Sequence, residues 1–408
     1  MNFAVDYLGK KFENPFVIAS SPPVADSDMI SRAFDAGWAG VVTKTLIQEP
    51  VKNLKNRFAS CKIGKDIFAF ENIELLSENS PEQWYRDIRL LKKRFPEKIV
   101  IGSIMGDAKS GEQWVRLASG CQDAGCDMIE LNFSCPHGYP EKGKGSAIGQ
   151  NPEFSSLITG WIKSERSVTI PIIPKLTGAV ADISHIGRAV KDAGADGICA
   201  INSFPSIMGF DLDTLKPLPN VAGYTTPGGY SGPGLKPIAL RCVSDLVKNP
   251  NLPVMGGGGI SSGKDAAEFI LAGASVLQIC TAVMLRGYSV VSGMLAELEE
   301  FMEKHKFSGI NDFLGAGNNM IRGYSELDMD YSVKAFVDPD KCSGCGKCFV
   351  SCRDAAYQAI EMRDNRAIVD AGKCKGCSLC CQICADNAIK MVQLTDKMLY
   401  PGSYNGLG

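Results

Sequence analysis

"DAGCDMIELNFS", residues 123–134, joins the end of an amphipathic stretch to a short run that is apolar on both faces. The glycine suits the C-cap of a helix, and a run that is apolar on both faces is typical of a buried parallel strand. The same junction returns at "DAGADGICAINS" (192–203), and "DAGW" (35–38) ends a third helical stretch. The chain is therefore expected to repeat a strand–helix unit.

Eight candidate strands occupy roughly the first 300 residues, at 15–20, 40–45, 98–105, 128–134, 171–177, 197–203, 253–259 and 275–283. Helical patterns with apolar positions three and four apart lie between them, for example at 28–38, 84–95 and 265–273. Eight such units predict an α/β fold, a TIM (β/α)₈ barrel with insertions at 46–80 and 204–235. A doubly wound open sheet is the competing interpretation.

The last fifth of the chain repeats one cysteine spacing. "KCSGCGKCFVSC" (341–352) and "KCKGCSLCCQIC" (373–384) both contain C-x₂-C-x₂-C-x₃-C. Such a run binds a [4Fe–4S] cluster, and its fourth cysteine ligates the other cluster of the pair. One cluster is expected on Cys342, Cys345, Cys348 and Cys384, and the second on Cys374, Cys377, Cys380 and Cys352. Zinc is the weaker interpretation, because it does not explain the doubled spacing.

Two details depart from the usual cluster motif. Arg353 and Ala385 stand where a proline normally follows the fourth cysteine, and Cys381 is outside the spacing. We expect ligation to survive the first change, and Cys381 to pack rather than ligate. The predicted organisation is a barrel over 1–308, a linker over 309–334, a ferredoxin-like domain over 335–395 and a C-terminal tail over 396–408.

The charges of the chain almost cancel, with a formal net charge of −2 at pH 7. This balance gives no reason to expect nucleic acid or an anionic membrane as partner. No apolar stretch reaches the roughly 18–20 residues of a membrane span, and the first residues lack the pattern of a signal peptide. We therefore expect a cytoplasmic protein whose sixteen cysteines are metal ligands and thiols rather than disulfides.

The segment "ELNFSCPHGYPEKGKGSAIGQ" (130–150) leaves the C-terminal end of the fourth strand, the face where barrel active sites form. It offers the amide of Asn132, the hydroxyl of Ser134 and the thiol of Cys135. A lone cysteine at such a position is more often a buried structural residue. The full motif Asn-x-Ser-Cys-Pro, however, resembles the active-site segment of the dihydroorotate and dihydropyrimidine dehydrogenase flavoproteins.

The residues after the cysteine separate these two families. Dihydroorotate enzymes usually continue with asparagine after the proline, whereas this chain has His137 and Gly138, which resembles dihydropyrimidine dehydrogenase. Seven further segments resemble that enzyme in the same order: "VTKT", "ENIELLS", "PKLT", "INS", "GGYSG", "GGGGISS" and "LQICTAV". The resemblance covers nearly the whole chain and includes the iron–sulfur module. It corresponds to the pyrimidine-reducing subunit, with FMN and iron–sulfur clusters, of the NAD-dependent form.

A flavin is also expected from the residues themselves. Lys44 and Lys175 lie at the ends of apolar strands, where each charge needs a partner, and a cation there would favour a reduced flavin. A structural salt bridge is the alternative for either lysine. The glycines of "GGGGISS" (256–262) offer backbone amides to a phosphate. With the contacts that the resemblance implies, the predicted FMN site is Ala19, Ser20, Lys44, Thr45, Lys175, Gly232, Gly257, Gly258, Gly259, Cys280 and Thr281.

The resemblance also implies a substrate site for uracil or thymine. It consists of carboxamides and hydroxyls that complement the imide edge of the ring: Asn72, Asn132, Ser134, Asn202 and Ser203. Cys135 matches the family's proton donor, and a thiol, with an ordinary pKa near about 8.5, can exchange a proton near neutrality. Of the three histidines, only His137 could compete for that role, because His185 and His305 fall in outer helical patterns.

The chain contains no complete G-x-G-x-x-G motif, since serine replaces the last glycine at 256–261 and at 257–262. Without a dinucleotide-binding domain we expect NAD and FAD to be bound only by a flavoprotein partner subunit, in a hetero-oligomer. The predicted function is oxidoreduction between uracil or thymine and the 5,6-dihydro forms, in pyrimidine degradation. A dihydroorotate dehydrogenase and a non-catalytic iron–sulfur electron-transfer subunit are the alternatives.

Overall fold

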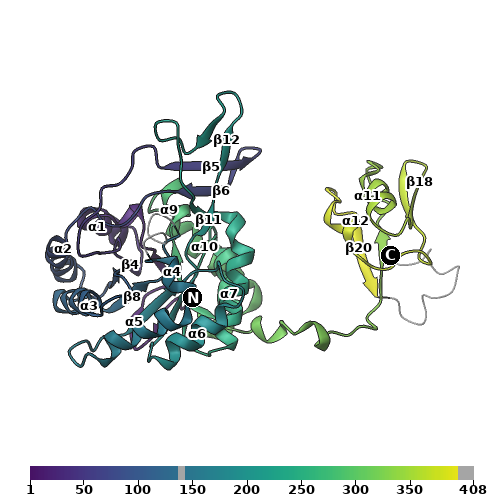
Figure 1. Ribbon diagram of the computed structural model, residues 1–408. Coiled ribbons are helices and arrows are strands. Elements are labelled where there is room, and N and C mark those ends of the chain that lie inside the picture. The colour runs from purple at the N-terminus through teal and green to yellow at the C-terminus, as the bar shows by residue number, and fades with distance from the viewer. Residues whose placement is uncertain (137–142, 394–408) are drawn as a thin grey trace. The chain divides into compact units, whose positions relative to one another are not determined.

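The computed structural model describes residues 1–136 and 143–393, and the chain forms two compact units that meet between Ile321 and Arg322 (Figure 1). His137, Gly138 and the predicted tail at 396–408 lie outside the described residues. The domain boundaries expected at 308, 334 and 395 stay predictions.

The first unit is built on a closed barrel of eight parallel strands. In order around the barrel, these are β3 (Phe16–Ile18), β4 (Gly40–Val42), β7 (Ile99–Ile104), β8 (Met128–Asn132), β9 (Ile172–Leu176), β10 (Ile198–Ala200), β15 (Val254–Gly257) and β16 (Ala274–Ile279). The barrel closes where β16 pairs with β3, with Leu277 beside Phe16. The prediction of a TIM barrel is therefore confirmed, and the open sheet is wrong.

Helices surround the barrel, as Figure 1 shows. They are α1 (Ser27–Asp35), α2 (Pro81–Arg94), α3 (Glu112–Ala124), α4 (Ser146–Gly149), α5 (Pro152–Ser164), α6 (Ile183–Asp192), α7 (Lys236–Lys248), α8 (Gly263–Leu271), α9 (Thr281–Arg286) and α10 (Val290–His305). Gly37, Gly125 and Gly194 follow three of them with φ near +100°, a left-handed conformation that favours glycine. The recurring "DAG" is thus the point where the chain leaves a helix for the next strand.

The two insertions meet in one antiparallel sheet. Its order is β11 (Phe204–Ser206), β14 (Gly228–Ser231), β6 (Asp66–Asn72) and β5 (Phe58–Ile63). Glu71 joins the insertions, because it is fully buried and accepts hydrogen bonds from Ser206 Oγ (2.8 Å) and the backbone N–H of Met208 (3.2 Å). Burial raises the pKa of Glu71 above its usual value, although these hydrogen bonds oppose the shift. The sheet therefore joins two excursions that leave the barrel after β4 and β10.

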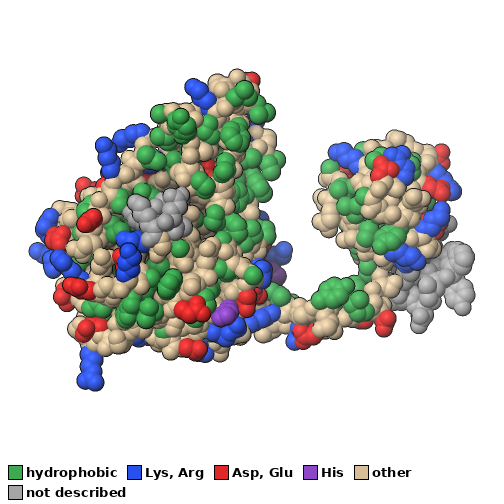
Figure 2. Space-filling view, in the orientation of Figure 1, with side chains coloured by type: hydrophobic (Ala, Val, Ile, Leu, Met, Phe, Trp, Pro, Cys, Tyr) green, Lys and Arg blue, Asp and Glu red, His purple; other side chains and the backbone are tan. Residues whose placement is uncertain are grey.

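A hairpin of β12 (Gly209–Asp211) and β13 (Lys216–Leu218) extends from this sheet. It exposes Ile207, Phe210, Leu212 and Leu215, and Figure 2 shows hydrophobic side chains gathered over β12. At the start of the chain, β1 (Val5–Tyr7) and β2 (Lys10–Phe12) form a second hairpin. Across the described residues, no helix combines the length and apolar character needed to cross a membrane.

The second unit, as far as Gln393, contains two small antiparallel sheets and two α-helices. β17 (Val333–Val337) pairs with β20 (Ile389–Gln393), and β18 (Ile360–Arg363) pairs with β19 (Arg366–Val369). Each cysteine run continues into a short helix, α11 (Lys347–Ala355) or α12 (Leu379–Gln382). The core contains few aliphatic side chains and four buried cysteines: Cys348, Cys352, Cys374 and Cys380. Thiols therefore occupy much of the interior that hydrophobic side chains fill in a larger domain.

Candidate active site

A cavity of about 560 Å³ lies beside the residues that follow the barrel strands. Sixteen of the seventeen residues expected at the flavin and substrate sites line it. They are Ala19, Ser20, Lys44, Thr45, Asn72, Asn132, Cys135, Lys175, Asn202, Ser203, Gly232, Gly257, Gly258, Gly259, Cys280 and Thr281. Its volume is in the usual range for a cofactor pocket.

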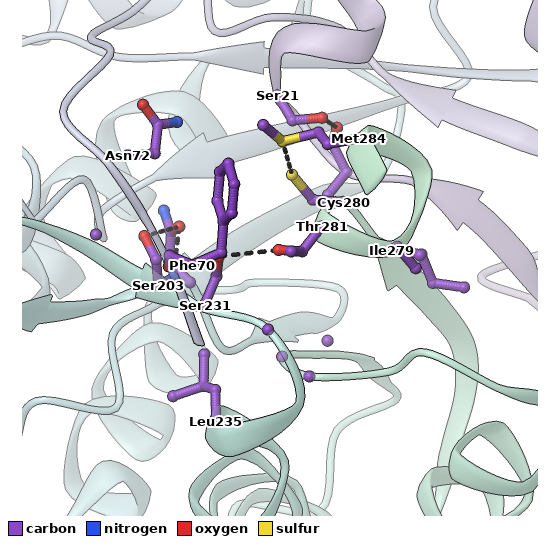
Figure 3. Close-up of a pocket in the computed structure, with 18 of the residues that line it drawn as sticks. Ser21, Phe70, Asn72, Ser203, Ser231, Leu235, Ile279, Cys280, Thr281 and Met284 are labelled. Atoms are coloured by element: carbon purple, nitrogen blue, oxygen red, sulfur yellow. Dashed lines mark hydrogen bonds between the residues drawn. The ribbon is translucent and has the colours of Figure 1, made fainter. Parts of the chain in front are cut away.

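The lining residues divide into two groups across this cavity. Figure 3 shows Asn72 and Ser203 on one side, and Cys280 and Thr281 on the other, with the ring of Phe70 between them. Thr281 Oγ1 donates to Ser231 Oγ at 2.8 Å, so the start of α9 is joined to the end of β14. The insertion sheet therefore forms part of the cavity wall.

Ser134 is the expected site residue that does not line the cavity. Its side chain is fully buried behind the wall, where Oγ donates to Asn132 Oδ1 (3.2 Å) and accepts from Asn202 Nδ2 (2.9 Å). Asn132 Nδ2 in turn donates to Thr45 Oγ1 at 3.0 Å. The structure thus gives Ser134 the task of orienting two amides, and its expected contact with substrate stays a prediction.

The same network continues into the barrel interior. Thr45 Oγ1 and Ser103 Oγ lie 2.9 Å apart, and Ser103 Oγ donates to Glu130 Oε1 at 3.2 Å. Gln278 Nε2 donates to Glu130 Oε2, while Gln278 Oε1 accepts from Lys175 Nζ, each at 2.7 Å. An unbroken hydrogen-bond chain therefore connects the expected substrate amides with the expected flavin lysine.

Lys175 and Glu130 form a buried ion pair within this chain. Lys175 Nζ lies 3.6 Å from Glu130 Oε2, and the two side chains are 6% and 1% exposed. Burial alone would lower the pKa of Lys175, but the negative charge of Glu130 outweighs it and raises this pKa above its usual value. Lys175 therefore keeps a positive charge at the cavity wall.

Lys44 is paired in a second buried cluster. Its Nζ lies 2.5 Å from Glu74 Oε1, and Arg57 Nε lies 2.6 Å from Glu74 Oε2. Lys44 and Glu74 both line the cavity, whereas Arg57 approaches from behind and is one-third exposed. The salt bridge that the sequence left as an alternative is thus present for both lysines, and in both cases the cation also faces the cavity.

The lining residues fit a flavin mononucleotide. Gly258 and Gly259 have φ of +114° and +84°, which side chains rarely adopt, and their backbone lines the cavity at the end of β15. Glycine there leaves backbone amides open to a phosphate, and the two lysines supply cations for an electron-rich ring system. The volume of the cavity, its glycine backbone and its two lysine charges therefore match what the predicted FMN site needs.

The backbone around Cys135 is fixed by the segment that follows it. Ser146 N donates to the carbonyl of Cys135 at 3.0 Å, and an added Cβ at Gly145, where φ is +58°, would lie 2.6 Å from the same oxygen. A Cβ at Gly149 would lie 2.0 Å from the carbonyl oxygen of Phe133. The glycines at 145 and 149 therefore allow the chain to return closely over Cys135, which is 5% exposed.

The cysteine-rich second unit holds two small cavities that are each lined by four cysteines. Cys342, Cys345, Cys348 and Cys384 line one, and Cys352, Cys374, Cys377 and Cys380 line the other. Each set takes three cysteines from one run and the fourth from the other run, as the spacing predicts. Within the described residues no three ligating side chains are arranged for a single metal ion. A [4Fe–4S] cluster, which sits between its thiolates, needs a wider arrangement. Cys381 lines neither cavity.

Comparison with known proteins agrees with this architecture. The family model described as "Dihydroorotate dehydrogenase" matches residues 2–302, and the model described as "4Fe-4S dicluster domain" matches residues 335–391. The chain belongs to the dihydroorotate dehydrogenase family. The resemblance found in the sequence motifs is therefore confirmed. The first match supports a flavin in the barrel, and the second supports iron–sulfur in the cysteine-rich unit.

Relatives within the dihydroorotate dehydrogenase family carry two kinds of name. The chain is 38% identical over 364 residues (88% of this chain, 87% of the relative) to "NAD-dependent dihydropyrimidine dehydrogenase subunit PreA" of Escherichia coli K12. It is 39% identical over 340 residues (80% and 79%) to "Dihydropyrimidine dehydrogenase (NADP(+)), chloroplastic" of Arabidopsis thaliana. It is also 38% identical over 312 residues (76% and 97%) to "Dihydroorotate dehydrogenase B (NAD(+)), catalytic subunit" of Pyrococcus abyssi.

The sequence prediction missed the groups that balance the two lysines. These are Glu74 and Arg57 around Lys44, and Glu130 and Gln278 around Lys175. A signal for Glu130 was present, because a carboxylate inside the apolar run "MIELN" must also find a partner. Glu74 lies in a segment without apolar periodicity, so nothing local indicates that it is buried.

The ion pair of Lys175 and Glu130 predicts the behaviour of a Glu130→Gln variant. Removing one partner of a buried pair typically costs about 3–5 kcal/mol, so the unfolding free energy should fall by about that amount. The double variant Glu130→Gln/Lys175→Met should recover much of the loss. Urea titration followed by tryptophan fluorescence measures this, since all four tryptophans lie in the barrel unit.

The pH dependence of this variant should have the opposite sign to that of the wild type. In the wild type the raised pKa of Lys175 stabilises the fold below the unfolded pKa, and that stabilisation is lost only as pH rises through the folded pKa. In the variant, burial lowers the pKa of Lys175 in the folded state, so the stability of the variant should rise relative to that of the wild type between about pH 7 and pH 9.

The exposed pair of Asp35 and Arg94 is the control for the loss of stability in Glu130→Gln, because Asp35→Asn should cost below about 0.5 kcal/mol. An equal loss in both variants would contradict the prediction.

Proposed function

We propose that this protein interconverts a pyrimidine base, uracil or thymine, with its 5,6-dihydro form, and that two [4Fe–4S] clusters relay the electrons. The observation that carries this proposal is the composition of one cavity. The amides of Asn72, Asn132 and Asn202 and the thiol of Cys135 line it together with two buried, paired lysines and a glycine-rich turn. Carboxamides carry both a donor and an acceptor and so complement the imide edge of a neutral ring.

The names of the relatives favour this reaction over dihydroorotate oxidation. The match to the P. abyssi catalytic subunit spans 312 residues, fewer than the 321 of the barrel unit. The match to the E. coli dihydropyrimidine dehydrogenase subunit spans 364 residues and so extends into the cysteine-rich unit. The similarity to the dihydropyrimidine-type relative thus includes part of the unit in which we propose the electron relay.

When bound, FMN would supply two-electron reduction of the ring, and the clusters would supply single electrons. Backbone amides of Gly257, Gly258 and Gly259 would hold the phosphate, and Lys44 and Lys175 would place positive charge beside the flavin ring. The two sets of four cysteines in the second unit would hold one [4Fe–4S] cluster each. NAD and FAD would belong to a partner flavoprotein subunit, because the chain lacks a dinucleotide-binding motif.

The remaining chemistry is assigned to the side chains of this chain. Asn72, Asn132 and Asn202 hold the pyrimidine by its imide edge, with Ser134 and Ser203 supporting the amides. In the reducing direction Cys135 gives the proton of its Sγ to C5 of the ring, and in the oxidising direction it takes that proton back. The low exposure of Cys135 limits the access of water to this proton.

Replacing Cys135 by alanine should lower turnover by about 10²-fold or more, the usual scale for a lost general acid. Flavin content, read from the visible spectrum, should be unchanged, because Cys135 is assigned to the substrate. Cys61→Ser is the matched control, since Cys61 is exposed on β5 and does not line the cavity, and its turnover should equal that of the wild type. Wild-type turnover in Cys135→Ala would assign the proton transfer to another group.

Two clusters predict about eight irons per chain. Cys384→Ser should lose about four of them, because Cys384 completes the set of Cys342, Cys345 and Cys348. Cys381→Ser, an adjacent thiol outside both sets, should retain all eight. Iron and acid-labile sulfide assays with electron paramagnetic resonance of the reduced protein measure this. Loss of iron in Cys381→Ser, with retention in Cys384→Ser, would reverse the assignment.

The partner proposal predicts that the isolated chain does not reduce uracil with NADH. It should do so with a one-electron donor such as reduced viologen, because the clusters accept single electrons. Adding the FAD-containing subunit should restore the NADH reaction, followed as NADH oxidation with uracil present and absent. Brisk NADH-dependent reduction by the purified chain alone would refute the need for a partner.

A further inference from the structure

Glu74 is an acidic side chain in a cavity that is expected to hold an uncharged ring. Of the described residues that line the cavity, Asp66 and Glu74 are acidic, and Asp66 is exposed whereas Glu74 is only 6% exposed. A buried carboxylate is costly unless it is paired and hydrogen-bonded. We therefore expect the carboxylate of Glu74 to have a function at the cavity wall.

Glu74 lies close to Asn72, one of the amides that are expected to bind substrate. The backbone N–H of Glu74 donates to Asn72 Oδ1 at 2.5 Å, which fixes the amide and the carboxylate in one turn after β6. The carboxylate itself lies between Lys44 and Arg57, at 2.5 Å and 2.6 Å. Glu74 thus adds negative charge at the wall where the ring is expected.

Three of the four cations among the described residues that line the cavity have partners within the protein. Lys44 pairs with Glu74, Lys175 pairs with Glu130, and Arg286 donates to the carbonyl of Ser261 at the glycine-rich end. Lys65 is exposed in the turn between β5 and β6. A substrate with a ring carboxylate would have to share Lys44 with Glu74 and approach a like charge in a poorly solvated place, which disfavours binding.

We propose that Glu74 determines the substrate class, because it commits Lys44 and so admits neutral pyrimidine bases while excluding those with a ring carboxylate, such as orotate. This inference rests on the proposed function, since it assumes that a pyrimidine binds beside Asn72. The selection is made by repulsion rather than by an added contact with the favoured ligand. Such selection would separate dihydropyrimidine from dihydroorotate dehydrogenase activity, the activities named for two relatives that are each 38% identical in sequence to this chain.

The first test uses the wild-type holoprotein and three ligands in isothermal titration calorimetry: uracil, orotate and orotamide, in which an uncharged carboxamide replaces the carboxylate at nearly the same size. Charge exclusion predicts that orotamide binds about 10-fold or more tightly than orotate, the effect of about 1.4 kcal/mol. Equal, weak binding of orotate and orotamide would mean that shape excludes both, and would overturn the proposal.

The second test is the Glu74→Gln variant, which keeps the size of the side chain and releases Lys44 from its carboxylate. The affinity of orotate relative to uracil should rise about 10-fold or more. Glu71→Gln is the matched control, because Glu71 is a buried carboxylate of β6 that does not line the cavity, and the ratio should not change. In the double variant Lys44→Met/Glu74→Gln the gain should disappear, whereas a loosened pocket would retain it.

The outcomes separate this proposal from the function on which it rests. If uracil does not bind to the wild-type holoprotein, the proposed function fails and this inference fails with it. If uracil binds but Glu74→Gln leaves the ratio of orotate to uracil affinity unchanged, the inference alone is wrong. Flavin absorbance recorded on each sample establishes that every variant retains the cofactor during the titration.

Discussion

A lysine ammonium that is almost completely removed from water stays charged only where an anion and hydrogen-bond acceptors compensate it. Lys175 meets this condition through Glu130 and Gln278 inside the barrel. Those two residues are held in turn by Ser103, Thr45 and Asn132 along one continuous chain. Because every member satisfies its neighbour, the position of the Lys175 ammonium and that of the Asn132 amide depend on each other. The barrel provides the rigid strand ends from which such a network can be built.

The cover of the cavity depends on a similar constraint. The insertion after β4 brings Glu74 to Lys44, and Arg57 of the same insertion shares that carboxylate. The insertion after β10 is joined to the first insertion by Glu71, whose carboxylate accepts hydrogen bonds from the Ser206 hydroxyl and the Met208 backbone N–H. Buried charges therefore attach both excursions to the barrel or to each other. The wall that they form can be specific because it is fixed by groups that cannot be left unpaired.

The parts of this arrangement that follow from local patterns were predictable. All eight barrel strands were predicted from short apolar runs, most of them apolar on both faces, and the doubled cysteine spacing anticipates which thiols share a cavity. Partners distant in sequence were not predictable, because only the closed barrel brings Gln278 to Glu130 across 148 positions. Ser134 shows a subtler limit, since its motif indicates that it belongs to the site but not that its side chain points behind the wall.

The cysteine-rich unit differs from the barrel in what stabilises its fold. Its hydrophobic core is small and is partly built from thiols, so side-chain burial alone provides little stabilisation. Metal–thiolate bonds supply what such a core lacks, since the free energy of ligation is also free energy of folding. Each set of four thiols takes one member from the opposite run, so a cluster bound to either set would tie the two halves of the unit together. The fold of this unit and its capacity to carry electrons therefore depend on the same sulfur atoms.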